Sequence, residues 1–268
     1  MRPGVILFIV EGKSEEAVFG PIFEGLFPSN VRTVFAAEHS DFLTGDARDP
    51  DHVVNKLEEL IYDSMRRNHY RLEDILEIVQ LADTDGCYIP DGAVVQDDDA
   101  GKIRYHSKRI VTHDKAGIEL RNFQKRKNLD RLVEREELLG IPYSIYYLSC
   151  NLDHVLTNVR NLPSKSKVQN AMSFARRYWR HPEEFVTFLL DPAVSAPGDY
   201  WESWSFIREY FNSLRRWSNL HLLFTEPKNV LLTENNENSE TGSEDERLRG
   251  CLLRETIEEE TAVLRSDV

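Results

Sequence analysis

Short, uninterrupted runs of apolar residues recur along the first 150 positions, and stretches with helical spacing of apolar residues separate them. The run at 5–10 is continuous and apolar, which is typical of a strand buried on both faces, and three further strands are predicted at 31–37, 78–82 and 143–148. Three intervening stretches are predicted to be helices: 14–27, 51–67 and 122–139. This alternation predicts an α/β fold with a mainly parallel sheet flanked by helices, and it places functional side chains at the carboxyl ends of the strands.

Local signals refine the boundaries of these elements. Ser14 is a residue type that caps helix N-termini, and Pro21 is expected to kink or shorten the first helix. Gly140 is expected to end the third helix. The composition of residues 90–101 is that of a loop.

Beyond Pro163 the chain becomes helical and aromatic, and all four Trp residues lie between Trp179 and Trp217. Large aromatic side chains in such a region are expected to pack in the core or between domains. Stacking on nucleic-acid bases is the alternative, and it would involve neighbouring arginines: Arg176, Arg177, Arg215 and Arg216. The chain is therefore predicted to divide into three parts: an α/β catalytic domain over 1–160, a helical accessory region over 161–228, and an acidic tail over 229–268 that is disordered from about 233 to 246 and ends in a helix.

Charge and cysteine content narrow the classes of function. The net charge is −13, which argues against nonspecific coating of DNA, although residues 102–135 are basic and a bound metal ion adds positive charge of its own. Three widely spaced cysteines suggest neither a disulfide framework nor a zinc site. No apolar run is long enough to span a membrane, and the first strand is not followed by a signal-peptide cleavage site. We therefore expect a cytoplasmic protein without a membrane partner.

Carboxylates follow two of the predicted strands directly. Glu11 and Gly12 come after the first strand, and Asp83-Thr84-Asp85 comes after the third. Alternate residues of an extended segment share a face, so Asp83 and Asp85 can converge on one ion while Thr84 points away. Carboxylate oxygens are hard ligands that suit Mg²⁺ or Mn²⁺. The pattern thus indicates a magnesium site where these two strands end.

These two segments together resemble the two motifs of the Toprim domain. VILFIVEGKSEEAVF (5–19) resembles the first motif, and LADTDGCYI (81–89) resembles the second. The form EGKSEE is most similar to small Toprim proteins of the OLD-nuclease and RloB-like kind, which are linked with phage defence. The resemblance covers roughly residues 4–150 and implies a Toprim-like (Rossmann-like) fold. It also implies that Glu11 acts in general acid/base chemistry and binds metal, while Asp83 and Asp85 hold Mg²⁺.

Three further residues are candidates for the same site. In the related proteins an acidic residue follows the fourth strand, and Asp153 lies in the corresponding segment here. It is expected to bind the metal ion, to position it, or to cap a helix. Lys13 is expected either to neutralise a substrate phosphate or to lie in solvent at the start of a helix. His154 is expected to orient a carboxylate, to contact phosphate or to be structural. The triplet at 97–99 (DDD) is predicted to belong to a solvated loop.

The resemblance implies a Mg²⁺-dependent nuclease that cleaves phosphodiesters of DNA or RNA by water attack, in anti-phage defence. One alternative is a phosphatase of the haloacid-dehalogenase type, with Asp83 as nucleophile and Asp85 as acid/base. Another is a non-catalytic Toprim-like protein that binds an ATPase. The sequence contains no GxxxxGK[ST] loop, so that ATPase would be a separate protein. The partners that follow are nucleic acid, a separate ATPase subunit and a second copy of the chain.

Overall fold

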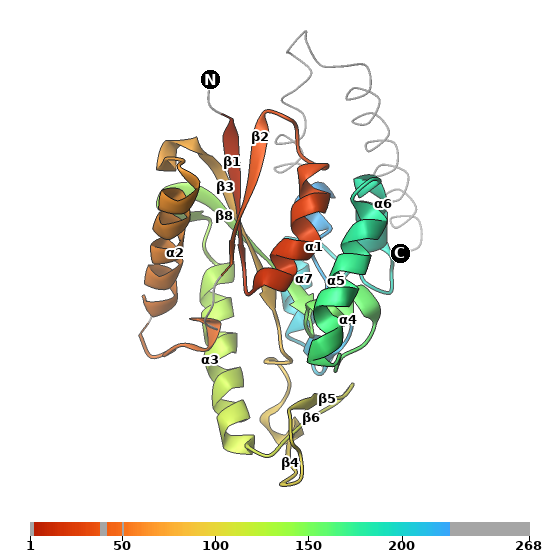
Figure 1. Cartoon of the computed structure of the whole chain (residues 1–268). Helices are drawn as coiled ribbons and strands as arrows, with labels where there is room; N and C mark the ends of the chain where they lie inside the picture. The colour runs from red at the N-terminus through yellow and green to blue at the C-terminus, as the bar shows by residue number, and fades with distance from the viewer. Residues whose placement is uncertain (1–2, 38–41, 50, 226–268) are drawn as a thin grey trace.

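The computed structural model describes residues 3–37, 42–49 and 51–225. Its main sheet is built from four parallel strands in the order β2-β1-β3-β8, and two short strands, β7 and β9, run antiparallel to β8 at its outer edge (Figure 1). The strands are β1 (Gly4–Val10), β2 (Val31–Ala37), β3 (Ile75–Asp83), β7 (Glu137–Leu138), β8 (Ile141–Ser149) and β9 (Trp217–Ser218). The predicted α/β fold with a mainly parallel sheet is confirmed.

Helices cover both faces of this sheet. They are α1 (Lys13–Glu24), α2 (His52–Asn68), α3 (Lys115–Val133), α4 (Leu152–Thr157), α5 (Ser164–Tyr178), α6 (Pro182–Leu190), α7 (Tyr200–Ile207) and α8 (Leu222–Thr225). Helices α2 and α3 lie on one side of the strands, and α1, α5 and α6 lie on the other (Figure 1). Residues 5–10 are all buried, as expected for a strand covered on both faces. None of the described helices is long and apolar enough to cross a membrane.

The hydrophobic core extends from the sheet into the C-terminal helices. The ring of Phe23 on α1 lies 6.1 Å from that of Phe185 on α6 and 5.7 Å from that of Phe224 on α8. Trp204 on α7 is fully buried and packs edge-on against Tyr147 of β8. Burying side chains of this size contributes roughly 2–3 kcal/mol each, so the residues after 160 help to hold the sheet. Of the remaining tryptophans, Trp179 and Trp201 are exposed and Trp217 is half-buried.

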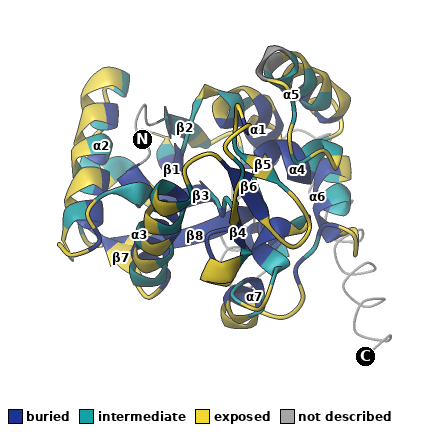
Figure 2. Cartoon of the chain, turned by 90° about the horizontal axis from the view of Figure 1, so that it is seen from below, coloured by how far each residue is buried: buried dark blue, intermediate teal, exposed yellow. Residues whose placement is uncertain are grey.

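A second, smaller sheet lies below the carboxyl ends of the main strands. It consists of β4 (Val94–Gln96), β5 (Arg104–Tyr105) and β6 (Ile110–Thr112), in the order β4-β6-β5. Figure 2 views the molecule from this end, with the small sheet in front. The prediction of a loop over 90–101 is therefore wrong for 94–96, because these residues pair with β6. Four short 3₁₀ turns complete the described elements: Phe42–Thr44, Leu72–Asp74, Asp91–Ala93 and Asn212–Leu214.

Two predicted helix boundaries are corrected. The helix expected at 122–139 is α3, which starts at Lys115 because Asp114 caps it by accepting a hydrogen bond from Gly117 N at 2.9 Å. It ends at Val133, and Gly140, with φ +74°, serves the turn between β7 and β8 instead. A glycine after a charged segment can therefore mark the turn between two strands as well as the end of a helix.

The first helix also differs from its prediction. Gly12, not Ser14, occupies the N-cap position of α1, because Ser14 already lies in the first turn. The helix runs through Pro21 and continues to Glu24. The predicted disorder and terminal helix of the tail, 229–268, lie outside the described residues.

The outer edge of β8 is hydrogen-bonded by side chains where no strand pairs with it. Ile145 N donates to the Tyr200 hydroxyl at 3.3 Å, and Trp204 Nε1 donates to Ile145 O at 3.3 Å. Tyr147 N donates to Asn219 Oδ1 at 2.8 Å, and the Ser218 hydroxyl donates to Tyr147 O at 2.9 Å. The region after residue 160 thus satisfies the backbone groups of the sheet edge.

Candidate carboxylate site at the sheet edge

Glu11 and Asp83 meet at the carboxyl ends of neighbouring strands. Glu11 follows β1 directly, Asp83 is the last residue of β3, and Asp83 N donates a hydrogen bond to Glu11 Oε1 at 3.1 Å. Asp83 Oδ1 in turn accepts from Leu152 N, at the start of α4, at 2.8 Å. Two carboxylates far apart in the sequence are therefore held side by side by backbone amides.

The turn after Asp83 separates its two aspartates by a buried threonine. The Thr84 hydroxyl donates to Ser213 O at 3.0 Å and points into the protein. Asp85 and Gly86 both have positive φ, +49° and +67°. A Cβ atom at Gly86 would lie 2.5 Å from a methyl carbon of Leu214, so both conformation and space require glycine there.

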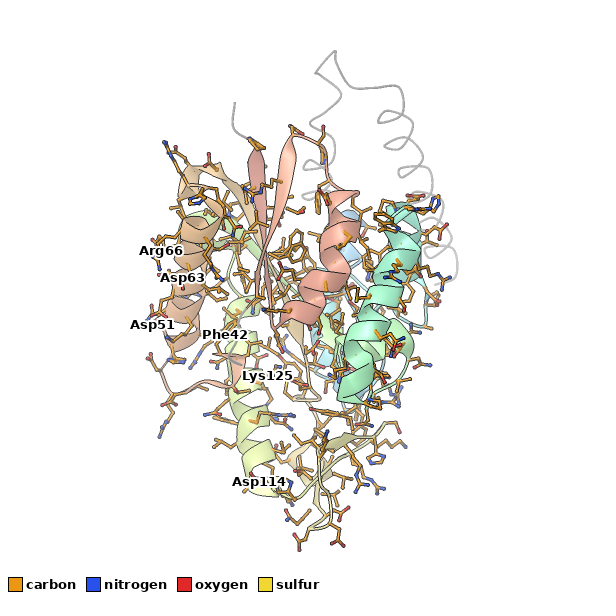
Figure 3. The ribbon with its side chains drawn as sticks, in the orientation of Figure 1. Phe42, Asp51, Asp63, Arg66, Asp114 and Lys125 are labelled. Atoms are coloured by element: carbon orange, nitrogen blue, oxygen red, sulfur yellow. The ribbon has the colours of Figure 1, made fainter. Side chains whose placement is uncertain are left out.

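Lys125 of α3 places its ammonium group between Glu11 and Asp85. Its Nζ lies 2.6 Å from Asp85 Oδ2 and 3.1 Å from Glu11 Oε1, and its side chain is fully buried. Figure 3 shows Lys125 on α3 beside the lower end of the sheet. The neighbouring positive charge outweighs burial, so the pKa of Asp85 lies below its ordinary value. Asp85 is therefore held as a carboxylate.

Tyr105 and Arg121 complete the surroundings of Asp85. The Tyr105 hydroxyl donates to Asp85 Oδ1 at 3.3 Å and accepts from Arg121 Nη1 at 3.0 Å. Arg121 Nη2 also donates to Asp85 O at 2.9 Å. Because Tyr105 belongs to β5, these bonds tie the small sheet to the carboxylate site.

The opposite side of the site is formed by α1, α4 and α5. Asp153 Oδ2 lies 2.7 Å from Lys167 Nζ, and Glu15 is buried in the first turn of α1. Burial raises the pKa of Glu15, and the charge of Asp153 adds to that shift. Burial raises the pKa of Asp83 well above its ordinary value, helped by the negative charges of Glu11, Glu15 and Asp85. On this side the positive charge of Lys167 does not offset the burial of Glu15.

The other predicted candidates have different surroundings. Lys13 is exposed at the start of α1. His154 is fully buried, its Nδ1 accepts from Cys150 N at 3.2 Å, and burial lowers its pKa to about 4. These surroundings favour the structural interpretation of His154. Asp97 forms an ion pair with Arg104 at 2.7 Å in the small sheet, in keeping with a solvated loop.

The donor set suits a hard divalent cation, but the side chains do not form a finished cage. Among the described residues, no three Asp, Glu, His or Cys side chains surround a common metal position. Glu11, Asp83 and Asp153 nevertheless offer carboxylate oxygens. Burial raises the pKa of Asp83 most, and the neighbouring negative charges, whose repulsion a cation would relieve, raise it further. Mg²⁺ commonly binds through one or two carboxylates and retains water, so this arrangement fits it.

Sequence reasoning did not single out Lys125, Arg121, Tyr105 or Lys167. A signal for Lys125 does exist in the sequence, because it lies seven residues after Ile118 and four before Leu129, both buried on α3. A lysine on the apolar face of a helix needs a buried partner.

Comparison of the chain with protein-family models, with curated proteins and with solved structures finds no match.

Proposed function

We propose that this protein is a cytoplasmic, Mg²⁺-dependent nuclease that hydrolyses phosphodiesters of DNA or RNA in anti-phage defence. The observation that carries the proposal is the contact between Glu11 and Asp83 at the carboxyl edge of a parallel sheet, inside a cluster of partly buried carboxylates. The Toprim resemblance supplies the reaction class and the setting in phage defence.

Each residue has a distinct role in this proposal. Glu11 and Asp83 hold the metal ion, and Asp153 supplies or positions a further ligand. Bound Mg²⁺ supplies Lewis-acid stabilisation of the phosphodiester and favours a water nucleophile at neutral pH. Glu11 accepts the proton of the attacking water. Lys125 keeps Asp85 ionised and fixes the positions of Glu11 and Asp85 through its ion pairs with both.

A polymeric substrate is favoured by the basic hairpin that carries β5 and β6. Its exposed side chains include five basic or histidine residues: Lys102, Arg104, His106, Lys108 and Arg109. Tyr105 joins this hairpin directly to Asp85. A phosphate chain lying along the hairpin would thus lead to the carboxylate site, despite the overall charge of −13.

The phosphatase alternative is less compatible with the local chemistry. It requires Asp83 to attack as a free carboxylate and Asp85 to give up a proton. Burial and neighbouring charges raise the pKa of Asp83, whereas that of Asp85 is lowered beside Lys125. Both shifts oppose the roles that this mechanism needs.

The proposal is tested by cleavage of plasmid, single-stranded DNA, total RNA and tRNA with Mg²⁺, Mn²⁺ or EDTA. We expect Glu11→Ala and Asp83→Asn each to reduce metal-dependent cleavage on the order of 100-fold or more. Glu16→Ala is the matched control, since Glu16 is exposed in the same first turn of α1. Cleavage that survives both substitutions would show the site assignment to be wrong. A folded wild type that cuts none of these substrates would favour the partner-binding alternative, in which a separate ATPase is required.

A further inference from the structure

Lys125 is the most completely enclosed charge in the carboxylate site. Its side chain has no exposed surface, and it lies in the middle of the 19-residue helix α3. The helix is anchored on both sides of it, by Arg121 bonded to Asp85 O and by Asn128 bonded to Leu43 O at 2.9 Å. The ammonium group is therefore a fixed part of the site.

The contacts of Asp85 leave little room for a metal ion. Lys125 Nζ lies 2.6 Å from its Oδ2, and the Tyr105 hydroxyl donates to its Oδ1. Both carboxylate oxygens thus already have donors. Glu11 Oε1 lies 3.1 Å from both Lys125 Nζ and the Asp83 amide, whereas the contact of Lys125 Nζ with Glu11 Oε2 is longer, at 3.4 Å.

We propose that the Lys125 ammonium group takes the place of a second divalent cation, so that the wild-type chain binds one divalent ion at Glu11 and Asp83. Asp85 then forms an ion pair with Lys125 and is not a metal ligand. The inference rests on the proposed metal-dependent function and specifies how many ions that site accepts.

The two sides of the site account for this asymmetry. The Asp153 carboxylate is paired with Lys167, whose side chain is 44% exposed and is free to swing into solvent when a metal ion arrives. Lys125 has no such freedom. A divalent ion can therefore replace Lys167 beside Asp153, but it cannot replace Lys125 between Glu11 and Asp85.

The test is the number of Mn²⁺ ions bound per chain, measured by equilibrium dialysis of the full-length protein. We expect one ion for the wild type and one more for Lys125→Met, because the emptied position between two carboxylates becomes available. Lys125→Arg should bind the same number as the wild type because it keeps the charge. Lys127→Met is the matched control, since Lys127 is exposed on the same helix, and it should also leave the number unchanged.

Thermal unfolding provides a second measurement in case Lys125→Met folds poorly without metal. Mn²⁺ should then raise the Tm of Lys125→Met by more than that of the wild type, because an added ion stabilises only the folded state. Two ions bound by the wild type, or no added ion and no larger Tm shift in Lys125→Met, would overturn the inference. A wild type that binds no Mn²⁺ while Lys125→Met binds one would instead retain the role of Lys125 and remove the proposed metal site.

Discussion

Two lysines neutralise the carboxylate site from opposite sides, and they do so in different ways. Lys125 has no exposed surface, and its partners Glu11 and Asp85 are 22% and 19% exposed. Lys167 lies 44% exposed beside Asp153. A lysine with no exposed surface is held in place by the fold, whereas a half-exposed lysine can exchange its partner for water. The comparison teaches that one side of the site is structural and the other is adaptable.

The largest effect should come from removing the buried charge. Lys125→Met leaves Glu11 and Asp85 without their shared cation, and losing one partner of a buried pair costs about 3–5 kcal/mol. We expect this loss in the free energy of unfolding, measured by urea titration in EDTA. Lys127→Met should stay within about 0.5 kcal/mol of the wild type. Equal losses in the two variants would contradict the structural role of Lys125.

When the stability of variants on either side is measured against pH, the titration of His221, which is buried between β9 and α8, must be taken into account. Burial lowers its pKa from the ordinary 6.5 to about 4. The unfolded chain therefore takes up this proton first, and stability is lost as the pH falls from about 6.5 towards 4. The loss is about 3 kcal/mol for this group. His221→Gln should flatten the scan by that amount in denaturant titrations at pH 7 and pH 4, whereas the exposed His181→Gln should not.

A smaller effect is expected at the link between the structural side and the small sheet. Tyr105→Phe removes the hydroxyl that bridges Asp85 and Arg121, which should cost about 1–2 kcal/mol. Amide hydrogen exchange should also become faster in β5 and β6, because the hairpin loses its tie to the site. Tyr62→Phe, at a 42% exposed position on α2, is the control. Unchanged exchange in the hairpin would show that Tyr105 does not anchor it.

The smallest effect should come from the adaptable side. Lys167→Met removes a half-exposed partner of Asp153, whose own side chain is 12% exposed, and should cost about 1 kcal/mol. The difference from the wild type should shrink further when NaCl is raised from 0.05 to about 1 M, because salt screens exposed pairs. A loss as large as that of Lys125→Met, measured by the same urea titration, would remove the contrast between the two sides.

The sequence was sufficient to predict the sheet because most of its strands are apolar runs. The runs at 78–82 and 143–148 fall within β3 and β8, which are buried along almost their whole length, and the run at 31–37 coincides with the half-exposed strand β2. The meeting of Glu11 and Asp83 also follows from this pattern, because both come where parallel strands end.

The rest of the site depends on tertiary contacts that spacing does not reveal. Lys125 and Arg121 lie in a segment so rich in charge that its inward face is hard to recognise. Tyr105 reaches Asp85 only because the small sheet folds under the main one, and Lys167 reaches Asp153 only because α5 packs against α1 and α4. Long-range ion pairs of this kind must be read from the fold.

The side-chain bonds along β8 have a consequence for self-association. Sheets join edge to edge, in dimers and in fibres, when a strand offers unpaired amides and carbonyls to another chain. Along β8 those groups are already taken at Ile145 and Tyr147, and β7 and β9 pair with its two ends. Among the described strands of the main sheet, edge-to-edge joining of two copies would therefore use β2, at the far end of the strand order.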